Sequence, residues 1–430
     1  MTDFVARLSN NHPASARLRG VYAICSAHPW VLEAALKHAK AEGTPLLIES
    51  TSNQVDQYGG YTGMTPKDFV AFVHQLADSV EFPHKDLILG GDHLGPNAWR
   101  SLHSNEAMQR AEALIDAYAA AGFTKIHLDT SMSCADDPSR LPDEVVAERA
   151  ARLCAVAEAA VDREGLKVRP VYVIGTEVPV PGGAAEALST VEVTNRAAAL
   201  ETAAIHRAAW DARGLDAAWP RVVALVVQPG VEFDHTRVVD YRPEHATELS
   251  RTLNALPGMV FEAHSTDYQT PEALRALVRD GFAILKVGPG VTFAMREALF
   301  ALADIESELI EPAASSRLRD VVERVMLEKP GYWEKYYHGD AMQQRQLRIF
   351  SYSDRIRYYW ADAEIQAAAK KLIDNLTAIG VPENALSQSL PNQYWALRRR
   401  EIDALPASIV EHKIREVIGE YASACVADDQ

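Results

Sequence analysis

Several features that often reveal the class of a protein are scarce or missing in this sequence. The chain of 430 residues has only 4 cysteines, and their spacing matches neither a zinc motif nor a disulfide framework. No apolar run reaches the roughly 18 residues that a membrane helix needs, and residues 1–19 lack the apolar segment of a signal peptide. We therefore expect free thiols, no membrane span and a cytoplasmic location.

Positive charge is also scarce. The 43 lysines and arginines are outnumbered by 59 aspartates and glutamates, which gives a formal net charge of -16. Such a chain repels nucleic acids and anionic membranes, although a local basic pocket for a phosphate is compatible with it. The loop GxxxxGK[ST] is absent as well, so the sequence has no visible phosphate cradle for an ATP-dependent phosphotransferase.

A repeated pattern is present instead: a short apolar run ends in a polar or glycine-rich tip and is followed by a helix-length amphipathic stretch. Strands that alternate with helices indicate a parallel sheet, and eight such units favour a closed (β/α)8 TIM barrel over an open doubly wound sheet. The eight runs are Val21–His28, Pro45–Thr51, Leu87–Gly95, Lys125–Ser131, Pro170–Val178, Val222–Gly230, Val260–Thr266 and Ala283–Gly290.

The alternation stops after the eighth unit. From about Pro312 onward the pattern is helical only, which predicts a barrel over residues 1–311 and a helical extension over residues 312–430 that packs on it. Aromatic residues are dense in Tyr332–Tyr337 and Tyr352–Trp360. These two stretches suit a cover over the barrel mouth or a homo-oligomer interface, and plain packing against the barrel explains them equally well.

Alternate residues of a barrel strand point inward, which identifies polar groups inside the barrel. In the fourth strand, Lys125, His127 and Asp129 share one face, and we expect that face to line the axis. The same parity sets Glu262 beside His264. It also turns Lys286 inward, where it either takes part in chemistry or only neutralises Glu262 as a buried polar plug.

Two strand ends carry histidines, and barrels place their chemistry at these ends. Asp92-His93 ends the third run and His264 ends the seventh, so we expect both histidines to hold a divalent metal unless they are structural. Asp92, Asp129 and Glu177 are the candidate acid/base groups, and Lys286 joins them as a catalytic candidate. Glu177 is also a candidate third ligand, and Gln228 is a weaker one.

A phosphate site is expected at the start of the eighth helix, because late barrel loops and helix N-termini commonly bind phosphate. Gly288 and Gly290 would supply backbone amides there. Ser265, Thr266 and Arg355 are candidates to add side-chain donors, and Glu49 and Asn97 at two other strand ends are further candidates for substrate binding.

Eight segments stand out in order along the chain: Cys25–Pro29, Thr51–Val55, Gly59–Met64, Gly90–Asn97, Ser131–Pro138, Gly175–Gly183, Phe261–Gln269 and Ser353–Trp360. Together they closely resemble one family, the non-catalytic (Z) subunits of tagatose-bisphosphate aldolase, formerly called tagatose 6-phosphate kinases. The resemblance spans roughly residues 5–415. It implies a barrel and a role in galactitol, tagatose or N-acetylgalactosamine catabolism. Some members support a separate catalytic aldolase subunit, whereas relatives epimerise a ketohexose phosphate at C4.

More distantly, the chain resembles the class II zinc aldolases. That resemblance implies that Asp92 is the catalytic aspartate, that His93 and His264 are metal ligands, and that Glu177 matches the family's glutamate. Ser265–Tyr268 stands where that family has a glycine-rich phosphate loop. The remaining ligand histidine has no secure counterpart, with His206 and His235 as candidates.

The leading hypothesis is a metal-assisted tagatose 6-phosphate 4-epimerase that gives fructose 6-phosphate by retro-aldol cleavage and re-addition. Its substrate is a small phosphorylated ketohexose, and its cofactor is a divalent metal such as Zn²⁺ or Mn²⁺, with neither ATP nor NAD. Lys286 would stabilise oxyanion charge. The alternative is a non-catalytic partner that stabilises a separate tagatose-bisphosphate aldolase subunit, and an ATP-dependent kinase is disfavoured.

Overall fold

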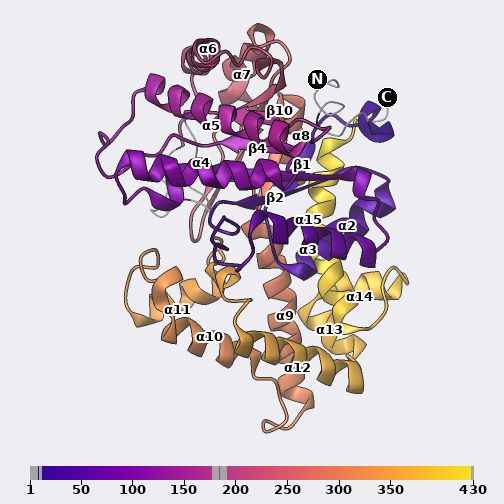
Figure 1. The fold of residues 1–430 in the computed structure, drawn as a ribbon. Helices are drawn as coiled ribbons and strands as arrows, with labels where there is room; N and C mark the ends of the chain where they lie inside the picture. Colours follow the sequence, from indigo (N-terminus) through magenta and orange to yellow (C-terminus); the bar gives the residue numbers. More distant parts are fainter. Residues whose placement is uncertain (1–7, 9–11, 177–183, 185–190, 428–430) are drawn as a thin grey trace.

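The computed structural model describes residues 8, 12–176, 184 and 191–427, and these form the expected barrel with a helical extension (Figure 1). Eight parallel strands close in the order β1-β10-β9-β6-β5-β4-β3-β2. The prediction of a (β/α)8 TIM barrel is confirmed. The barrel strands are β1 (Val21–Ile24), β2 (Leu46–Thr51), β3 (Leu87–Leu94), β4 (Lys125–Leu128), β5 (Val171–Ile174), β6 (Val222–Val226), β9 (Val260–Ala263) and β10 (Phe282–Val287).

Helices follow the strands and form the outer layer. Those of the barrel are α2 (Pro29–Glu42), α3 (Pro66–Ser79), α4 (Ser104–Ala120), α5 (Asp143–Glu164), α6 (Arg196–Ala212), α7 (Pro243–Thr252), α8 (Pro271–Arg279) and α9 (Pro289–Leu309). Those of the extension are α10 (Leu318–Glu328), α11 (Ala341–Phe350), α12 (Ala363–Ile379), α13 (Glu383–Ser389), α14 (Pro391–Arg398) and α15 (Pro406–Cys425).

Two local details differ from the sequence pattern. A small antiparallel hairpin, β7 (Glu232–Phe233) with β8 (Val238–Val239), follows β6 and was not expected, because two-residue strands leave no periodic signal. Serine is a favoured N-cap type, but Ser104 is already the first residue of helix α4, and the N-cap is His103.

The extension lies at one end of the molecule and returns to the barrel. Figure 1 shows α10, α11, α12 and α13 gathered around the far half of α9. Helix α15 then runs back and packs on α2, α8 and α9, so the last helix belongs to the barrel wall. A division of the chain at residue 311 stays a prediction. None of the described helices is long and apolar enough to cross a membrane, and all four cysteines are free thiols.

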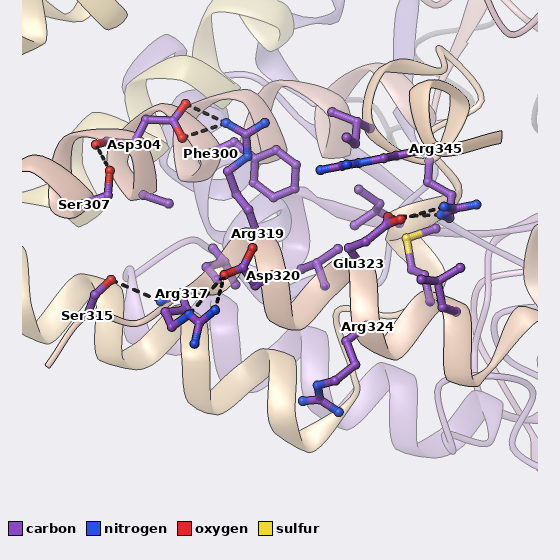
Figure 2. Close-up of a pocket in the computed structure, with 18 of the residues that line it drawn as sticks. Phe300, Asp304, Ser307, Ser315, Arg317, Arg319, Asp320, Glu323, Arg324 and Arg345 are labelled. Carbon is purple, nitrogen blue, oxygen red and sulfur yellow. Dashed lines mark hydrogen bonds and ion pairs between the residues drawn. The ribbon is translucent and has the colours of Figure 1, made fainter. Parts of the chain in front are cut away.

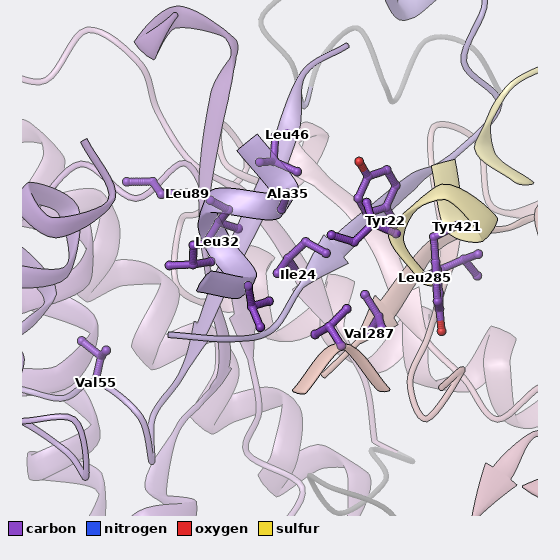
Figure 3. Close-up of a cluster of buried hydrophobic side chains, with 14 of the residues drawn as sticks. Tyr22, Ile24, Leu32, Ala35, Leu46, Val55, Leu89, Leu285, Val287 and Tyr421 are labelled. Atoms are coloured by element: carbon purple, nitrogen blue, oxygen red, sulfur yellow. The ribbon is translucent and has the colours of Figure 1, made fainter. Parts of the chain in front are cut away.

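The apolar core has two layers, one outside the strands and one inside. Figure 3 shows part of the outer layer, where Ile24 of β1 lies near Leu32 of α2 and Leu285 of β10 lies near Tyr421 of α15. The inner layer fills the end of the barrel where most strands begin, and we call it the floor. Its members include Val21, Leu47, Ile88, Val171, Val260 and Ile284. Burial of these side chains on both faces of the strands stabilises the barrel.

Candidate active site at the strand ends

The backbone is irregular where β3 ends. The pairing of β3 with β4 shifts register between Gly91 and Leu94, and His93 has a φ of 51°. A non-glycine residue in this left-handed region costs roughly 1–3 kcal/mol, and such strain gathers at functional sites. Gly95 permits a close approach, because a Cβ there would come within 1.7 Å of the Asp129 carbonyl oxygen.

Three buried histidines from different strands meet at this point. His93 comes from β3, His127 from β4, and His264 directly follows β9. The ring centroids of His93 and His264 are 4.9 Å apart, and His127 lies 5.2 Å from each of them. The three rings therefore lie against one another, and His127 and His264 offer ligand nitrogens within 4.8 Å of each other.

Asp129 orients the first of these histidines. Its carboxylate lies 2.8 Å from Nδ1 of His93 and also accepts a hydrogen bond of 2.7 Å from the Ser131 hydroxyl. Burial alone would lower the pKa of His93, but Asp92 and Asp129 outweigh burial and raise it to about 9. A carboxylate on one imidazole nitrogen fixes the ring and directs the other nitrogen, as it does around metal-binding histidines.

His127 has an unused nitrogen. Its Nδ1 lies 3.0 Å from Oδ1 of Asp92 and 3.2 Å from the backbone amide of His93. Its Nε2 is buried and has no hydrogen-bond partner among the described residues. A buried polar atom without a partner costs roughly 1–3 kcal/mol, and a ligand bound to this nitrogen would relieve that cost.

His264 completes the trio, with Nε2 2.9 Å from Oε1 of Glu262. Burial is the main cause that lowers the pKa of this imidazole. Burial opposes ionisation of Asp92, but His93, His127 and His264 outweigh it and hold the pKa of that carboxyl far below its usual range. Asp92 is therefore ionised at any ordinary pH.

Two lysines and two glutamates lie beneath the histidines. Lys125 Nζ is 2.5 Å from Glu49 and 2.7 Å from Glu262, which confirms that this face of β4 points inward. Lys286 Nζ contacts Glu49 and lies 2.8 Å from Asp92. Its distance to Glu262 is 3.7 Å, so that pair is only a minor part of the network.

Glycine makes room for this network, and burial tunes it. A Cβ at Gly90 would come within 2.6 Å of the Glu49 carboxylate, so only glycine fits beside it. Burial lowers the pKa of Lys286 to about 8. We call the whole set the rim cluster; its members are Glu49, Asp92, His93, Lys125, His127, Asp129, Glu262, His264 and Lys286.

A cavity of about 80 Å³ opens onto the rim cluster. It adjoins a second cavity of about 480 Å³, and Cys25, Gln54, Tyr61 and Arg357 line both. Ligand pockets usually measure roughly 300–1,000 Å³, so a hexose phosphate needs both cavities. The first is lined by Asp92, His93, His264, Ser265, Lys286 and Gly288 among the predicted residues.

The other predicted residues have different surroundings. Glu49 is held in the lysine network, and Thr266 bonds the backbone oxygen of Lys286 at 2.7 Å. Gln228 accepts hydrogen bonds from the amides of Gly230 and Val231 within its own loop. Asn97 does not line the cavity, and Glu177 lies outside the described residues.

Two phosphate-binding predictions meet a specific obstacle. The guanidinium of Arg355 bonds the backbone oxygen of Tyr332 and stacks on Tyr336, away from the cavity. The amides of Gly288 and Gly290 already donate to Asp267, at 2.9 and 2.7 Å.

Three residues of the site were missed as site residues: Asp267 and Arg357 line the cavity, and His127 is buried in the rim cluster. His127 follows from the strand parity that identified Lys125, whereas no sequence signal singled out Asp267 or Arg357. Of the two further histidine candidates, His206 bonds a backbone oxygen within α6, and His235 bonds Tyr336 and two serines.

The rim cluster fits a divalent cation. Asp92, His127, Glu262 and His264 offer ligand atoms that all lie within 4.8 Å of one another. Imidazole nitrogens and carboxylates are ligands that Zn²⁺ and Mn²⁺ accept. A second group, Cys25 with Glu49 and Asp92, fits less well, because burial raises the pKa of Cys25 to about 12 and keeps the thiol protonated.

A larger cavity, of about 810 Å³, lies between α9, α10 and α11 but has no comparable chemistry (Figure 2). Its charged groups neutralise each other: Arg319 lies 2.6 Å from Asp304, and Arg317 lies 2.9 Å from Asp320. These partly exposed pairs are typical of a solvated surface. The candidate site is therefore the smaller cavity at the rim.

The fold and the site together define a (β/α)8-barrel protein with a candidate metal centre at the carboxyl ends of its strands. The family model for D-tagatose-1,6-bisphosphate aldolase subunit GatZ/KbaZ-like proteins matches residues 6–426, and the chain belongs to this family. The crystal structure of a probable tagatose 6 phosphate kinase from Sinorhizobium meliloti 1021 is 53% identical, with a TM-score of 0.88 over 94% of this chain and 100% of that one.

Two further solved structures are much more distant. A fructose-bisphosphate aldolase (Fba) from Campylobacter jejuni is 14% identical, with a TM-score of 0.42 over 88% of this chain and 93% of that one. The fructuronate-tagaturonate epimerase UxaE from Cohnella laeviribosi is 11% identical, with a TM-score of 0.46 over 95% and 81%. At these values neither structure indicates what this chain does.

Proposed function

We propose that this chain is a tagatose 6-phosphate 4-epimerase that forms fructose 6-phosphate by retro-aldol cleavage and re-addition. The observation that supports it is that His93, His264, Asp92 and Lys286 line one cavity, with the buried His127 packed against both histidines and its Nε2 unpartnered among the described residues. Burying so many ionisable groups costs free energy that a purely structural barrel would not need to spend.

His127 and His264 belong to the set of mutually close ligand atoms and would hold the metal. His93 lies outside that set, so its ring, bonded to Asp129 through Nδ1, would have to turn to join them as the third imidazole. A bound divalent cation would supply Lewis-acid polarisation of the C2 carbonyl. This assignment leaves Asp92 free for proton transfer. In this assignment His127 takes the place of the remaining ligand histidine, for which the sequence offered only His206 and His235 as candidates.

The chain's own residues would carry the proton and the charge. The C4 hydroxyl is β to the C2 ketone, so removing its proton lets the C3–C4 bond break into a three-carbon enediolate and an aldehyde. Asp92 lines the cavity beside Lys286, so by its position it would accept that proton and return it. Lys286 would donate a hydrogen bond to the developing oxyanion. Re-addition to the other face of the aldehyde inverts C4 and consumes no cofactor.

Carbon NMR of the purified chain with tagatose 6-phosphate and a divalent metal tests the proposal. We expect fructose 6-phosphate to form without ATP or NAD. Asp92→Asn should lower turnover by about 100-fold or more, because it removes the proton acceptor. The matched control is Asp304→Asn in the cavity between α9 and α10, which should leave turnover unchanged.

The second candidate is a stabilising subunit of tagatose-1,6-bisphosphate aldolase, and the description of the family favours it. In that case the pure chain is inert on both hexulose phosphates, with metals supplied. It would instead raise the activity or thermal stability of a tagatose-bisphosphate aldolase when the two are mixed. That pair of results would exclude the epimerase.

A further inference from the structure

The N-terminus of α9 already holds an anion, and the anion belongs to the chain itself. The Asp267 carboxylate accepts hydrogen bonds from the amides of Gly288 and Gly290, at 2.9 and 2.7 Å. The side chain is buried, and a Cβ at Gly290 would approach the same carboxylate oxygen to 3.0 Å. Late barrel loops and helix N-termini are common phosphate sites, and here a carboxylate takes that place.

A phosphate cannot share this position with Asp267. Its oxygens would compete for the same two amides and would meet a like charge, which is strongly unfavourable in a site of low dielectric. The Asp267 carboxylate therefore closes the position to any substrate phosphate unless its side chain moves away. An anionic substrate must be bound by another group.

Among the described residues that line the cavity, Arg357 is a cation without an ion pair, although Asp267 and Asp354 are near enough to act on it through their charge. Its guanidinium bonds the backbone oxygen of Ser353 and lies 2.9 Å from the Tyr358 hydroxyl, and it forms no ion pair with a carboxylate of the described residues. The adjacent Asp354 carboxylate is taken by Arg296 at 2.7 Å and by Thr292 at 2.6 Å.

The other basic groups that line the cavity are already paired. Lys286 lies 2.8 Å from Asp92, His93 lies 2.8 Å from Asp129, and His264 lies 2.9 Å from Glu262. Arg357 also lines both cavities, so it stands where they adjoin. Its planar guanidinium matches the oxygens of a phosphate in bidentate geometry.

We propose that Arg357 binds the terminal phosphate of the substrate, and that Asp267 closes the start of α9 to a second phosphate. The site would then select a ketose monophosphate over a ketose bisphosphate. This inference rests on the proposed function, which supplies the identity of the sugar. It adds which carbon atoms of that sugar carry a phosphate.

Calorimetric binding to the metal-loaded full chain tests the inference without turnover. Three probes are compared: tagatose, tagatose 6-phosphate and tagatose 1,6-bisphosphate. The wild type should bind the monophosphate more tightly than either of the other two. Arg357→Gln should weaken monophosphate binding by about 10–100-fold, the value of a charge-assisted hydrogen bond, and leave tagatose binding unchanged. Arg355→Gln is the matched control and should leave the ratio of the affinities for tagatose 6-phosphate and tagatose unchanged.

Variants of Asp267 test the closed position. Asp267→Ala vacates the two amides, so the bisphosphate should bind about 10-fold or more tightly than it does to the wild type. Asp267→Asn removes the charge and keeps an acceptor, so its gain should be smaller. Equal affinity of the wild type for both phosphates, or an Arg357→Gln variant with an unchanged ratio, would overturn the inference.

These results are independent of the proposed reaction. If the chain is inactive but binds the three probes with the expected affinities, the epimerase proposal is wrong and the role of Arg357 in phosphate binding is supported. If the chain is an active epimerase but Arg357→Gln leaves the ratio of monophosphate to tagatose affinity unchanged, the epimerase proposal stands and the role of Arg357 in phosphate binding is wrong.

Discussion

The floor and the rim cluster fill the same barrel with opposite kinds of side chain. At the floor, valine, leucine and isoleucine close the interior. At the rim, some neighbouring positions differ sharply: His127 of β4 pairs in register with Val173 of β5, and Glu262 of β9 pairs with Val226 of β6. Valine therefore fits at this depth of the barrel. Packing at this depth does not require the charged residues, although they are buried there.

The stability of the rim cluster should depend on the balance of its buried charges, whereas the floor contains no charges to balance. A buried ion pair adds little net stability, yet removal of one partner is expensive because the other charge stays buried. At the floor a truncation loses only packing. The predictions below test this contrast, from the largest expected effect to the smallest.

Lys125→Met should be the most damaging change to stability. It leaves Glu49 and Glu262 buried without the cation that lies 2.5 and 2.7 Å from them. The free energy of unfolding should fall by about 3–5 kcal/mol, measured by denaturant titration. The double variant Lys125→Met/Glu49→Gln should recover part of this loss. A loss below about 1 kcal/mol would show that the rim tolerates unbalanced charge.

Asp267→Asn should change how stability depends on pH. Burial raises the pKa of the Asp267 carboxyl to about 6, above the ordinary 3.8. The folded state therefore binds the proton more tightly, and this contribution to stability is complete below about pH 4 and is lost as the pH rises through about 6. Relative to the wild type, the asparagine variant should gain about 2–3 kcal/mol between pH 4 and pH 7. Parallel stability curves over this range would contradict the assignment.

Asp129→Asn should weaken metal binding without unfolding the barrel. The carboxylate orients His93 through Nδ1 at 2.8 Å, and loss of such a partner lowers metal affinity by about 10–100-fold. Competition with a chelator measures the affinity. The control is Ser131→Ala, which removes only the hydroxyl that bonds Asp129 and should have a smaller effect.

The barrel could be predicted because each of its strands is an apolar run with a clear tip, long enough to give a signal. Asp92, His93 and His264 could be predicted as site residues for the same reason, because they lie at the ends of those runs. Asp267 was not, because its two partners lie more than 20 residues away and meet it only through the pairing of β9 with β10.

Arg355 and Arg357 illustrate a second limit. They lie two residues apart in a short 3-10 helix, Arg355–Tyr358, where three residues make a turn, so the two side chains point in different directions. Sequence alone does not tell which one faces the cavity. Packing decides it: Arg355 is held by Tyr332 and Tyr336, whereas Arg357 reaches the cavity.

Ile88→Val should have the smallest effect on stability, and it tests the floor side of the comparison between floor and rim. Ile88 is buried among the apolar interior residues and pairs in register with Leu47 of β2. Loss of one methylene should lower the free energy of unfolding by about 0.5–1.5 kcal/mol, measured by the same denaturant titration as for Lys125→Met. Metal affinity should stay unchanged, because no atom of the rim cluster loses a partner. A change of metal affinity as large as that of Asp129→Asn would mean that floor and rim act as one unit, and the division between packing and chemistry would fail.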